Sequence, residues 1–307
     1  MSIASSRSRA NLLLLLTAII WGFAFVAQRS SMTHVGPFTF NAIRFLIGGL
    51  ALAPLMLILD RRRAAAKAPV VAFGNRALLI GGALAGAVIF AAATLQQMGI
   101  VSTTAGKAGF ITSLYVVLVP LLGLALGHRP SVAVWAGALL AAVGLYFLTI
   151  EGGGLHMAWG DALVLAGAFL WAGHVLLIGH LSPGTDPVKL AFLQFMACAA
   201  LSALAAALTE TISMVALRAA LVPILYAGLM SVGVGYTLQV IAQGHARPAD
   251  AAILLSLEAV FAVIGGWLLL GEMLSARALF GCALMLTGIL VSQLVGRPED
   301  MAAEISH

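Results

Sequence analysis

Ten apolar runs of about twenty residues divide this chain, and a run of that length is enough to cross a lipid bilayer as an α-helix. They cover residues 10–29, 38–59, 77–98, 105–127, 131–150, 159–180, 187–208, 219–242, 249–271 and 276–295. Only 9% of the residues are charged and 62% are hydrophobic, whereas a soluble domain has about a quarter of its residues charged. The sequence therefore predicts an all-α integral membrane protein with ten transmembrane helices.

Lysine and arginine are distributed unevenly between the two sides of the expected bilayer. Eleven of the sixteen lie on the side that holds the N-terminus, with the densest group at Arg61, Arg62 and Arg63. Four lie on the opposite side, namely Arg29, Lys107, Arg218 and Arg277. Because cytoplasmic loops are enriched in basic residues, we expect both termini in the cytoplasm. The net charge of +5 reflects this topology, so nucleic acid is not an expected partner.

The second half of the chain repeats the first. Ile20-Trp21-Gly22 aligns with Leu170-Trp171-Ala172 at an offset of 150 residues, and Leu95-Gln96 aligns with Leu238-Gln239 at an offset of 143. At an offset of 144 the aligned pairs are Thr112 with Ser256, Gly127 with Gly271, Gly137 with Gly281 and Gly144 with Gly288. Each half holds five helices, an odd number, so the second half must enter the membrane in the opposite orientation. Such inverted repeats (5+5) are typical of secondary transporters, whose substrate site lies between the halves near the midplane.

These patterns divide the chain into five parts. We expect a cytoplasmic N-terminus at 1–9, a first repeat at 10–150, a linker at 151–158, a second repeat at 159–295 and a cytoplasmic tail at 296–307. The leucine-rich run after Arg9 would also suit a cleaved signal peptide. That run contains Trp21 and belongs to the repeat, so we expect it to be part of the fold.

Several short motifs resemble those of the drug/metabolite transporter superfamily, in its EamA-like ten-helix branch. They are Trp21-Gly22, Trp171-Ala172, Asn41-x-x-Arg44-Phe45, and Ser256-Leu257-Glu258-Ala259-Val260-Phe261 followed by Leu270-Gly271-Glu272. The chain is most similar to bacterial exporters of aromatic and other neutral amino acids. This resemblance implies an inner-membrane exporter of small metabolites that hydrolyses no ATP. The family usually has proline after the motif glutamate, where this chain has Ala259, so we expect the kink at this point to be lost.

Three charged residues lie in or at the ends of the apolar runs. Glu258 is about 14 Å into its helix at 1.5 Å per residue, and at the offset of 144 its counterpart is Leu114. Charges at that depth usually face a cavity or a partner, so Glu258 is either a proton-coupling or substrate-ammonium site, or a hydrogen-bonded carboxyl that holds helices together. Arg44 is expected to be structural, since its counterpart is the neutral Gln194. Lys107 reads as an interface lysine that could also attract a substrate carboxylate.

Aromatic and amide residues at helical spacing indicate a binding cavity. The candidates are Trp21, Phe25, Gln28, Phe90, Thr94, Gln97, Trp171, His174, Tyr236 and Gln239. A largely apolar cavity with a few amides and hydroxyls suits a neutral or zwitterionic amphiphile. The alternative is plain helix packing in which polar side chains join neighbouring helices.

Other functions find less support in the sequence. The chain has no H-E-x-x-H, G-x-S-x-G or Walker motif, so we expect neither an enzyme nor a bound cofactor or metal. The chain also lacks the filter sequence or ring of charged side chains that a channel would need. We therefore predict a secondary transporter of small neutral metabolites, amino acids first among them, with proton-coupled export of hydrophobic cations as the alternative. The expected partners are the substrate, the lipid bilayer and, if coupling exists, protons, and the protein is expected as a monomer or weak homodimer.

Overall fold

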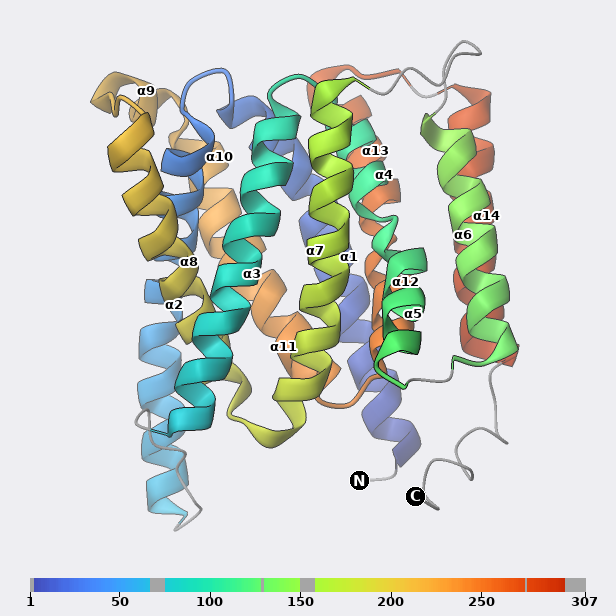
Figure 1. The fold of residues 1–307 in the computed structure, drawn as a ribbon, viewed down its shortest axis with the longest axis horizontal. Helices are drawn as coiled ribbons and strands as arrows, with labels where there is room; N and C mark the ends of the chain where they lie inside the picture. The colour runs from blue at the N-terminus through green and yellow to red at the C-terminus, as the bar shows by residue number, and fades with distance from the viewer. Residues whose placement is uncertain (1–2, 67–74, 128–129, 150–157, 274, 296–307) are drawn as a thin grey trace.

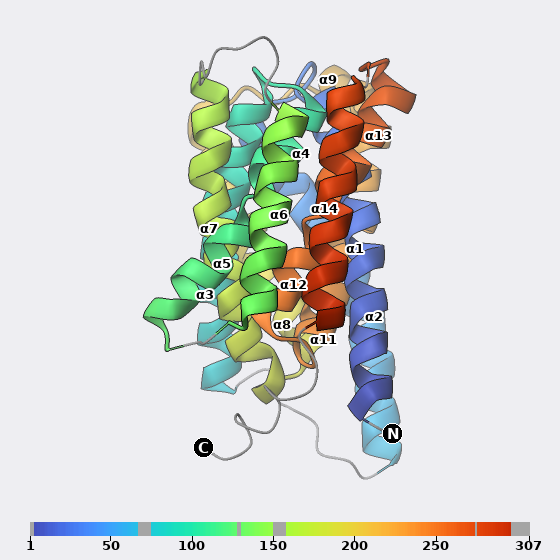
Figure 2. The ribbon, with the colours of Figure 1, turned by 90° about the vertical axis from the view of Figure 1, so that its right-hand side faces the viewer.

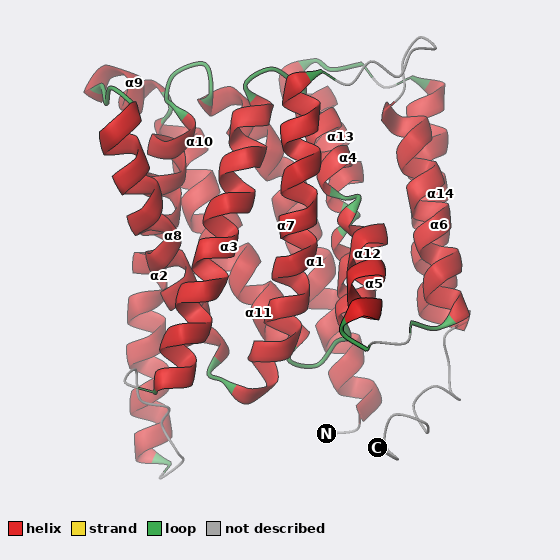
Figure 3. Cartoon of the chain, in the orientation of Figure 1, coloured by secondary structure: helices red, strands yellow, loops and turns green. Residues whose placement is uncertain are grey.

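The computed structural model describes residues 3–66, 75–127, 130–149, 158–273 and 275–295, which form a bundle of helices (Figure 1). Within these residues there is no β-strand (Figure 3). The first half of the chain forms α1 (Ile3–Ser31), α2 (Pro37–Ala65), α3 (Arg76–Ile100), α4 (Ala105–Thr112), α5 (Tyr115–Ala125) and α6 (Val132–Thr149). The second half forms α7 (Trp159–Leu181), η1 (Ser182–Gly184), α8 (Pro187–Thr209), α9 (Met214–Ala219), α10 (Leu221–Leu225), η2 (Tyr226–Tyr236), α11 (Thr237–Gln243), α12 (Pro248–Leu255), α13 (Glu258–Leu270) and α14 (Ala276–Val295).

The chain crosses the bundle repeatedly, and the start of α1 and the end of α14 lie at the same end of the molecule (Figures 1 and 2). We call this the termini end and the other the far end. Among the described residues, eight spans are long and apolar enough to cross a membrane, with α4 and α5, α10 to α11, and α12 and α13 each counted as one. Helices α6 and α14 contain the shorter apolar stretches Val132–Gly144 and Leu279–Gly288. The expected multi-pass, all-helical membrane fold is therefore confirmed. The expected linker lies outside the described residues except for Ala158, and the tail at 296–307 lies outside them.

Helix starts follow from capping residues in the short connections. Pro37, Pro187 and Pro248 each open a helix, where the missing backbone N–H of proline costs no hydrogen bond. The Asn75 side chain accepts from Ala77 N at the start of α3. A side-chain oxygen in this position satisfies one of the free N–H groups of a helix N-terminus.

The fourth span of each half is interrupted near its middle. Helix α4 ends at Thr112 and α5 begins at Tyr115, while α12 ends at Leu255 and α13 begins at Glu258. At each break a backbone N–H bonds to the carbonyl three residues back, from Leu114 to Ile111 and from Leu257 to Leu254. The residues at both breaks keep right-handed helical dihedrals, so each break is a tightened, 3₁₀-like turn, and such a stretch within a helix often marks a functional hinge. These paired breaks therefore mark the region between them as a candidate site.

The break before Glu258 corrects the expectation drawn from Ala259. We predicted that the kink would be lost without proline, yet the helix is interrupted there. The Ser256 hydroxyl donates to Ile253 O over 2.7 Å, and such back-bonding competes with helix hydrogen bonds. At the other break the Ser113 hydroxyl likewise donates to Gly109 O over 2.9 Å. Serine and a tightened turn therefore produce the break without a proline.

The third span of the second half differs from its counterpart α3. It contains the π-helix η2, whereas α3 is α-helical throughout. Within η2, a Cβ at Gly228 would lie 2.8 Å from Ile47 Cγ2, and one at Gly235 would lie 2.6 Å from Trp21 Nε1. These glycines let η2 approach α2 and α1 closely. Single π-helical segments are frequent at functional sites.

Helices from the two halves pack reciprocally. Helix α7 packs along α3, and α1 packs along the span formed by α10, η2 and α11, while α2 packs along α8. Helices α6 and α14 pack on each other at one side of the bundle (Figures 1 and 2). Between them, a Cβ at Gly144 would lie 2.6 Å from Gly281 O, and a Cβ at Gly288 would lie 2.6 Å from Gly137 O. The aligned glycines of the two halves therefore make the same close approach.

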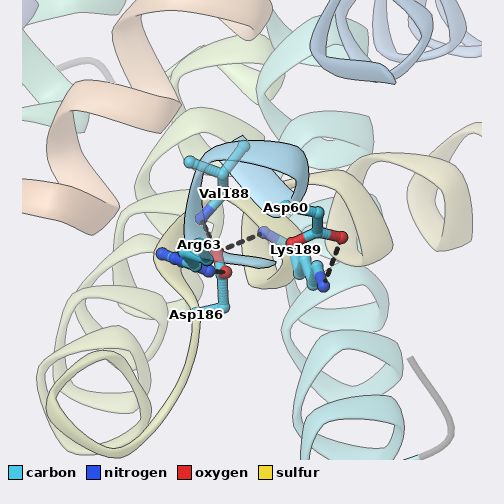
Figure 4. Close-up of polar contacts among 5 residues, drawn as sticks. All are labelled: Asp60, Arg63, Asp186, Val188 and Lys189. Carbon is cyan, nitrogen blue, oxygen red and sulfur yellow. Dashed lines mark hydrogen bonds and ion pairs between the residues drawn. The ribbon is translucent and has the colours of Figure 1, made fainter. Parts of the chain in front are cut away.

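Ion pairs join α2 to α8 at the termini end (Figure 4). Lys189 Nζ lies 2.8 Å from Asp60 Oδ2, and Arg63 pairs with Asp186. Asp186 also accepts from Val188 N over 3.0 Å and so caps α8. At the other end of the same helix pair, Glu210 accepts from two backbone N–H groups at the start of α2. Charged contacts therefore hold α2 and α8 together at both ends.

Candidate substrate-binding pocket

A pocket lies between the two halves, next to both interrupted spans. Its lining comprises Trp21, Ala24, Phe25, Gln28, Arg44, Gln96, Thr112, Tyr115, Trp171, His174, Val175, Ser231, Tyr236, Gln239, Leu255 and Glu258. The empty space in this region is about 460 Å³ when its open part is included, but the centre of a water molecule can reach only about 30 Å³ of it. One water needs roughly 10–15 Å³ on that measure. In this conformation the pocket therefore has room for water and none for a metabolite.

Two tryptophans hold the walls of the pocket in corresponding ways. Trp21 Nε1 donates to Ser231 O over 3.1 Å, and Trp171 Nε1 donates to Gln96 Oε1 over 2.7 Å. The first bond joins α1 to η2 and the second joins α7 to α3. A buried indole N–H needs such a partner. Each hydrogen bond thereby fixes a tryptophan whose ring lines the pocket.

Tyr236 lies at the centre of an aromatic cluster. Its ring centroid is 4.5 Å from that of Trp21 and 6.0 Å from that of Trp171. The rings of Phe45, His174 and Phe195 lie within 6.2 Å of it. Aromatic pairs at these separations attract each other beyond their simple burial. The cluster brings together rings from five different spans, and those of Trp21, Trp171, His174 and Tyr236 line the pocket.

The side chain of Gln96 makes three hydrogen bonds at the pocket. Its Nε2 donates to Gln28 Oε1 over 2.9 Å, and its Oε1 accepts from Trp171 and, at 3.4 Å, from Thr112. These bonds connect α3 to α1, α7 and α4. His174 contributes a separate bond, since its Nε2 lies 3.0 Å from Gln194 Oε1. The amides therefore fix the relative positions of the helices that form the pocket.

Glu258 occupies the first turn of α13, where the helix dipole favours negative charge. Glu258 Oε1 and Tyr115 Oη both belong to residues of the pocket lining, and neither atom makes a hydrogen bond within the described residues. The equivalent helix starts place Tyr115 opposite Glu258 at an offset of 143. This corrects the expected counterpart, Leu114, by one residue. Glu258 is only 3% exposed and keeps unsatisfied acceptor capacity toward the pocket.

Arg44 lines the pocket with a positive charge. It is 2% exposed, and its guanidinium lies 5.1 Å from the ring centroid of Phe40 and 4.8 Å from that of Phe45. Its Nε donates to Asn41 Oδ1 over 3.0 Å, whereas Nη2 has no partner within the described residues. A cation at the centre of a membrane helix costs at least about 2.5–3.5 kcal/mol. Arg44 therefore brings a buried guanidinium nitrogen without a partner to the lining of the pocket.

Seven of the ten cavity candidates line the pocket, namely Trp21, Phe25, Gln28, Trp171, His174, Tyr236 and Gln239. The other three lie elsewhere. Phe90 stacks on Phe38 with ring centroids 6.4 Å apart, and Gln97 donates to Gln28 O over 3.3 Å. Thr94 does not belong to the lining either. Lys107 lies at the far end, where its Nζ is 2.5 Å from Asp161 Oδ2, so its charge is already compensated.

Sequence reasoning missed four polar residues of the lining: Gln96, Thr112, Tyr115 and Ser231. Gln96 carried a usable signal, because it aligns with the candidate Gln239. The helical spacing from Phe90 selected its neighbour Gln97 instead. Tyr115 was hidden by the offset of 144, which aligned Glu258 with Leu114. Ser231 contributes its backbone carbonyl to Trp21, a role that no side-chain pattern indicates. Among the described residues, no group of three or more His, Cys, Asp or Glu side chains could hold a metal ion.

Comparisons with known proteins agree with this architecture. Residues 8–150 and residues 158–294 each match the EamA-like transporter family. An uncharacterized transporter of Archaeoglobus fulgidus is 33% identical over 292 residues, which cover 94% of this chain and 87% of the relative. The uncharacterized transporter YwfM of Bacillus subtilis is 29% identical over 304 residues, or 97% of each chain. A solved crystal structure has the same fold, with a TM-score of 0.74 at 22% identity over 94% of this chain and 98% of that one. The chain therefore belongs to the EamA-like transporter family, within the drug/metabolite transporter superfamily.

Proposed function

We propose that this protein is a secondary transporter that exports small neutral or zwitterionic metabolites, amino acids first among them, by alternating access. The observation that carries the proposal is the pocket next to the two interrupted spans, whose lining combines aromatic rings with amides. Discontinuous helices at the boundary between two halves are typical of secondary transporters. An apolar pocket with a few placed polar groups suits a small amphiphilic ligand.

The narrowness of the pocket supports a cycle with more than one conformation. The space that a water centre can reach is about 30 Å³, so a substrate can enter only after the helices around the pocket move apart. We propose that residues 10–150 and 159–295 act as two inverted five-helix repeats that exchange conformations. Opening at one end of the bundle would then alternate with opening at the other. The charged contacts of α2 and α8 at both ends would break and re-form during that exchange.

The orientation follows from the distribution of basic residues. We propose that the termini end faces the cytoplasm of a bacterial cell and that the protein lies in the inner membrane. Arg61, Arg62 and Arg63 close α2 at this end, in agreement with the enrichment of positive charge on the cytoplasmic side. Export would thus run from the termini end to the far end.

A second candidate is proton-coupled export of hydrophobic cations, and Glu258 favours it. A buried carboxyl group that lines the pocket and lacks a full set of partners could alternate between binding a proton and binding a cation. The two candidates predict different substrates. They also differ in their response to a proton gradient, because cation export requires a group that titrates.

Counterflow in proteoliposomes tests the proposal. Purified protein would be reconstituted into liposomes loaded with unlabelled amino acid, and entry of the labelled amino acid would be followed with and without a pH gradient. Saturable, temperature-dependent exchange of neutral amino acids is the expected result. Exchange restricted to hydrophobic cations, lost in Glu258→Gln, would favour the second candidate. Linear, non-saturable flux would indicate a channel and contradict both, and so would the absence of exchange for every substrate.

A further inference from the structure

We propose that Arg44 and Glu258 are the two charged ends of a zwitterion-binding site, with Arg44 holding the carboxylate of the substrate and Glu258, together with Gln239, holding its ammonium group. This inference rests on the proposed transport function and specifies its substrate class. It assigns Arg44, which the sequence pattern had marked as structural, to substrate contact, and it selects the substrate-ammonium role among the alternatives left open for Glu258.

The guanidinium of Arg44 has hydrogen-bonding capacity that the protein does not use. Its Nη2 is buried without a partner, and within the described residues the hydrogen bond that it makes goes from Nε to the neutral Asn41. Within the described residues no Asp or Glu lies at ion-pair distance from it. The rings of Phe40 and Phe45 offset part of the charge and bring no negative group. An arginine presents a planar fork that matches a carboxylate in two-point contact.

Hydrogen-bond acceptors that could bind an ammonium group also belong to the pocket lining. Glu258 Oε1 and Gln239 Oε1 are both buried acceptors without a hydrogen-bond partner within the described residues. Buried polar groups are nearly always satisfied, so each exception has a reason, such as a bound water or ion, a ligand or a functional role. An ammonium group carries three donors and no acceptor. It therefore complements these two oxygens as a carboxylate complements Arg44.

Arg44 and Glu258 do not neutralise each other directly. No ion pair connects them, although both line the pocket. A zwitterion supplies one charge of each sign and adds no net charge to the membrane interior. A plain amine or a plain carboxylate would satisfy one end and leave the other buried and unmatched. The pocket should thus discriminate against both analogues, since an unpaired polar group in a binding site is strongly disfavoured.

Matched analogues provide the test. L-phenylalanine, phenethylamine and 3-phenylpropionate share one skeleton and differ only in the two charged groups, and L-leucine, isoamylamine and 4-methylpentanoate form a second set. Binding to full-length protein in detergent would be followed by tryptophan fluorescence, since Trp21 and Trp171 line the pocket. Flux would be measured in proteoliposomes. The wild-type protein should bind at least one of the two amino acids at least tenfold more tightly than either of its analogues.

Variants separate the two ends. Arg44→Gln should weaken amino-acid binding at least tenfold and leave amine binding unchanged, with partial recovery in Arg44→Lys. Glu258→Gln should weaken amino-acid binding while leaving carboxylate binding unchanged. The matched control is Arg218→Gln, which removes an exposed cation of α9 outside the pocket. Because Arg44→Gln removes a buried unpaired charge, its melting temperature should equal or exceed that of the wild type.

The outcomes distinguish this inference from the proposed function. Saturable flux of amines or acids without preference for either amino acid would keep the transporter and overturn the zwitterion site. Equal amino-acid binding by wild type and Arg44→Gln would overturn the role of Arg44. A large drop in the melting temperature of Arg44→Gln, with Arg44→Lys binding as tightly as the wild type, would assign Arg44 to helix packing. Absence of saturable flux and of binding for all six probes would overturn both proposals.

Discussion

The indole nitrogen of Trp171 donates a hydrogen bond to Gln96 Oε1 over 2.7 Å, and this bond joins α7 to α3 at the wall of the pocket. Trp21 makes the corresponding bond from α1 to Ser231 O in η2. Each tryptophan thus ties the first helix of its own half to the third span of the other half. The same two side chains shape the pocket and connect the halves, so a movement that opens the pocket must also change these contacts.

Loss of either tryptophan should abolish transport. We expect Trp21→Ala and Trp171→Ala to fold and to lose flux, because both the ring surface and the bond across the halves disappear. Trp171→Phe keeps a ring but loses the hydrogen bond. Since a bond of this kind contributes about 1 kcal/mol to stability, the variant should be slightly less stable than the wild type, and its flux should lie between those of the wild type and Trp171→Ala. Trp159→Phe is the control, as Trp159 is 77% exposed. Normal flux in both alanine variants would show that the pocket is not the substrate site.

The ion pair between Lys189 and Asp60 should contribute to stability at the termini end. Lys189 is 2% exposed, so Asp60→Asn removes the carboxylate next to a buried ammonium group. We expect a loss of about 1–3 kcal/mol, less than for a fully buried pair because Asp60 is partly exposed. Thermal melting in detergent measures it. The double variant Asp60→Asn/Lys189→Met should recover most of the loss, and a purely additive result would show that the two residues are not coupled.

Glycine at the contact of α6 and α14 should not tolerate even a methyl group. A Cβ at Gly144 would lie 2.6 Å from the backbone oxygen of Gly281, so Gly144→Ala must push the helices apart. Overpacking of this kind costs about 1–3 kcal/mol. Gly173→Ala is the matched control within a helix, because nothing lies within 4 Å of its Cβ position. It should be neutral or stabilising by up to about 1 kcal/mol through helix propensity. Equal melting temperatures for the two variants would contradict the close contact.

Proline should be accepted at the start of α13 and rejected one turn later. Ala259 is the second residue of α13, and its N–H bonds only to Ser256 O, three residues back, over 3.1 Å. Ala259→Pro should therefore change stability by less than about 1 kcal/mol, since a helix tolerates proline in its first turn. Ala262→Pro, at an equally buried alanine, should cost about 3 kcal/mol or more. Similar losses for both would mean that the helix is effectively continuous through Ser256 and Leu257.

The sequence by itself determined the class of protein, the apolar runs that became helices and the aligned residues of the two halves. Hydrophobic length decides whether a segment crosses a bilayer, and residues such as Trp21, Trp171 and Gln239 occur at repeated offsets. These features need no knowledge of which helices touch. For the same reason the resemblance carried by Glu258 and its neighbours was sufficient to indicate the family.

Only the tertiary structure decided which face of each helix meets the pocket. Successive residues of a helix point about 100° apart, so neighbours such as Gln96 and Gln97 face different surroundings, and only packing selects between them. The alignment of Tyr115 with Glu258 likewise depends on where the two spans break. The position of each break is determined locally, by a serine and a tightened turn. The role proposed for Arg44 depends on contacts that no sequence pattern shows. Two rings and one amide surround its guanidinium group, and one guanidinium nitrogen has no partner within the described residues. Whether a buried charge is compensated depends on side chains brought from other helices, so its role becomes evident only once the helices are packed.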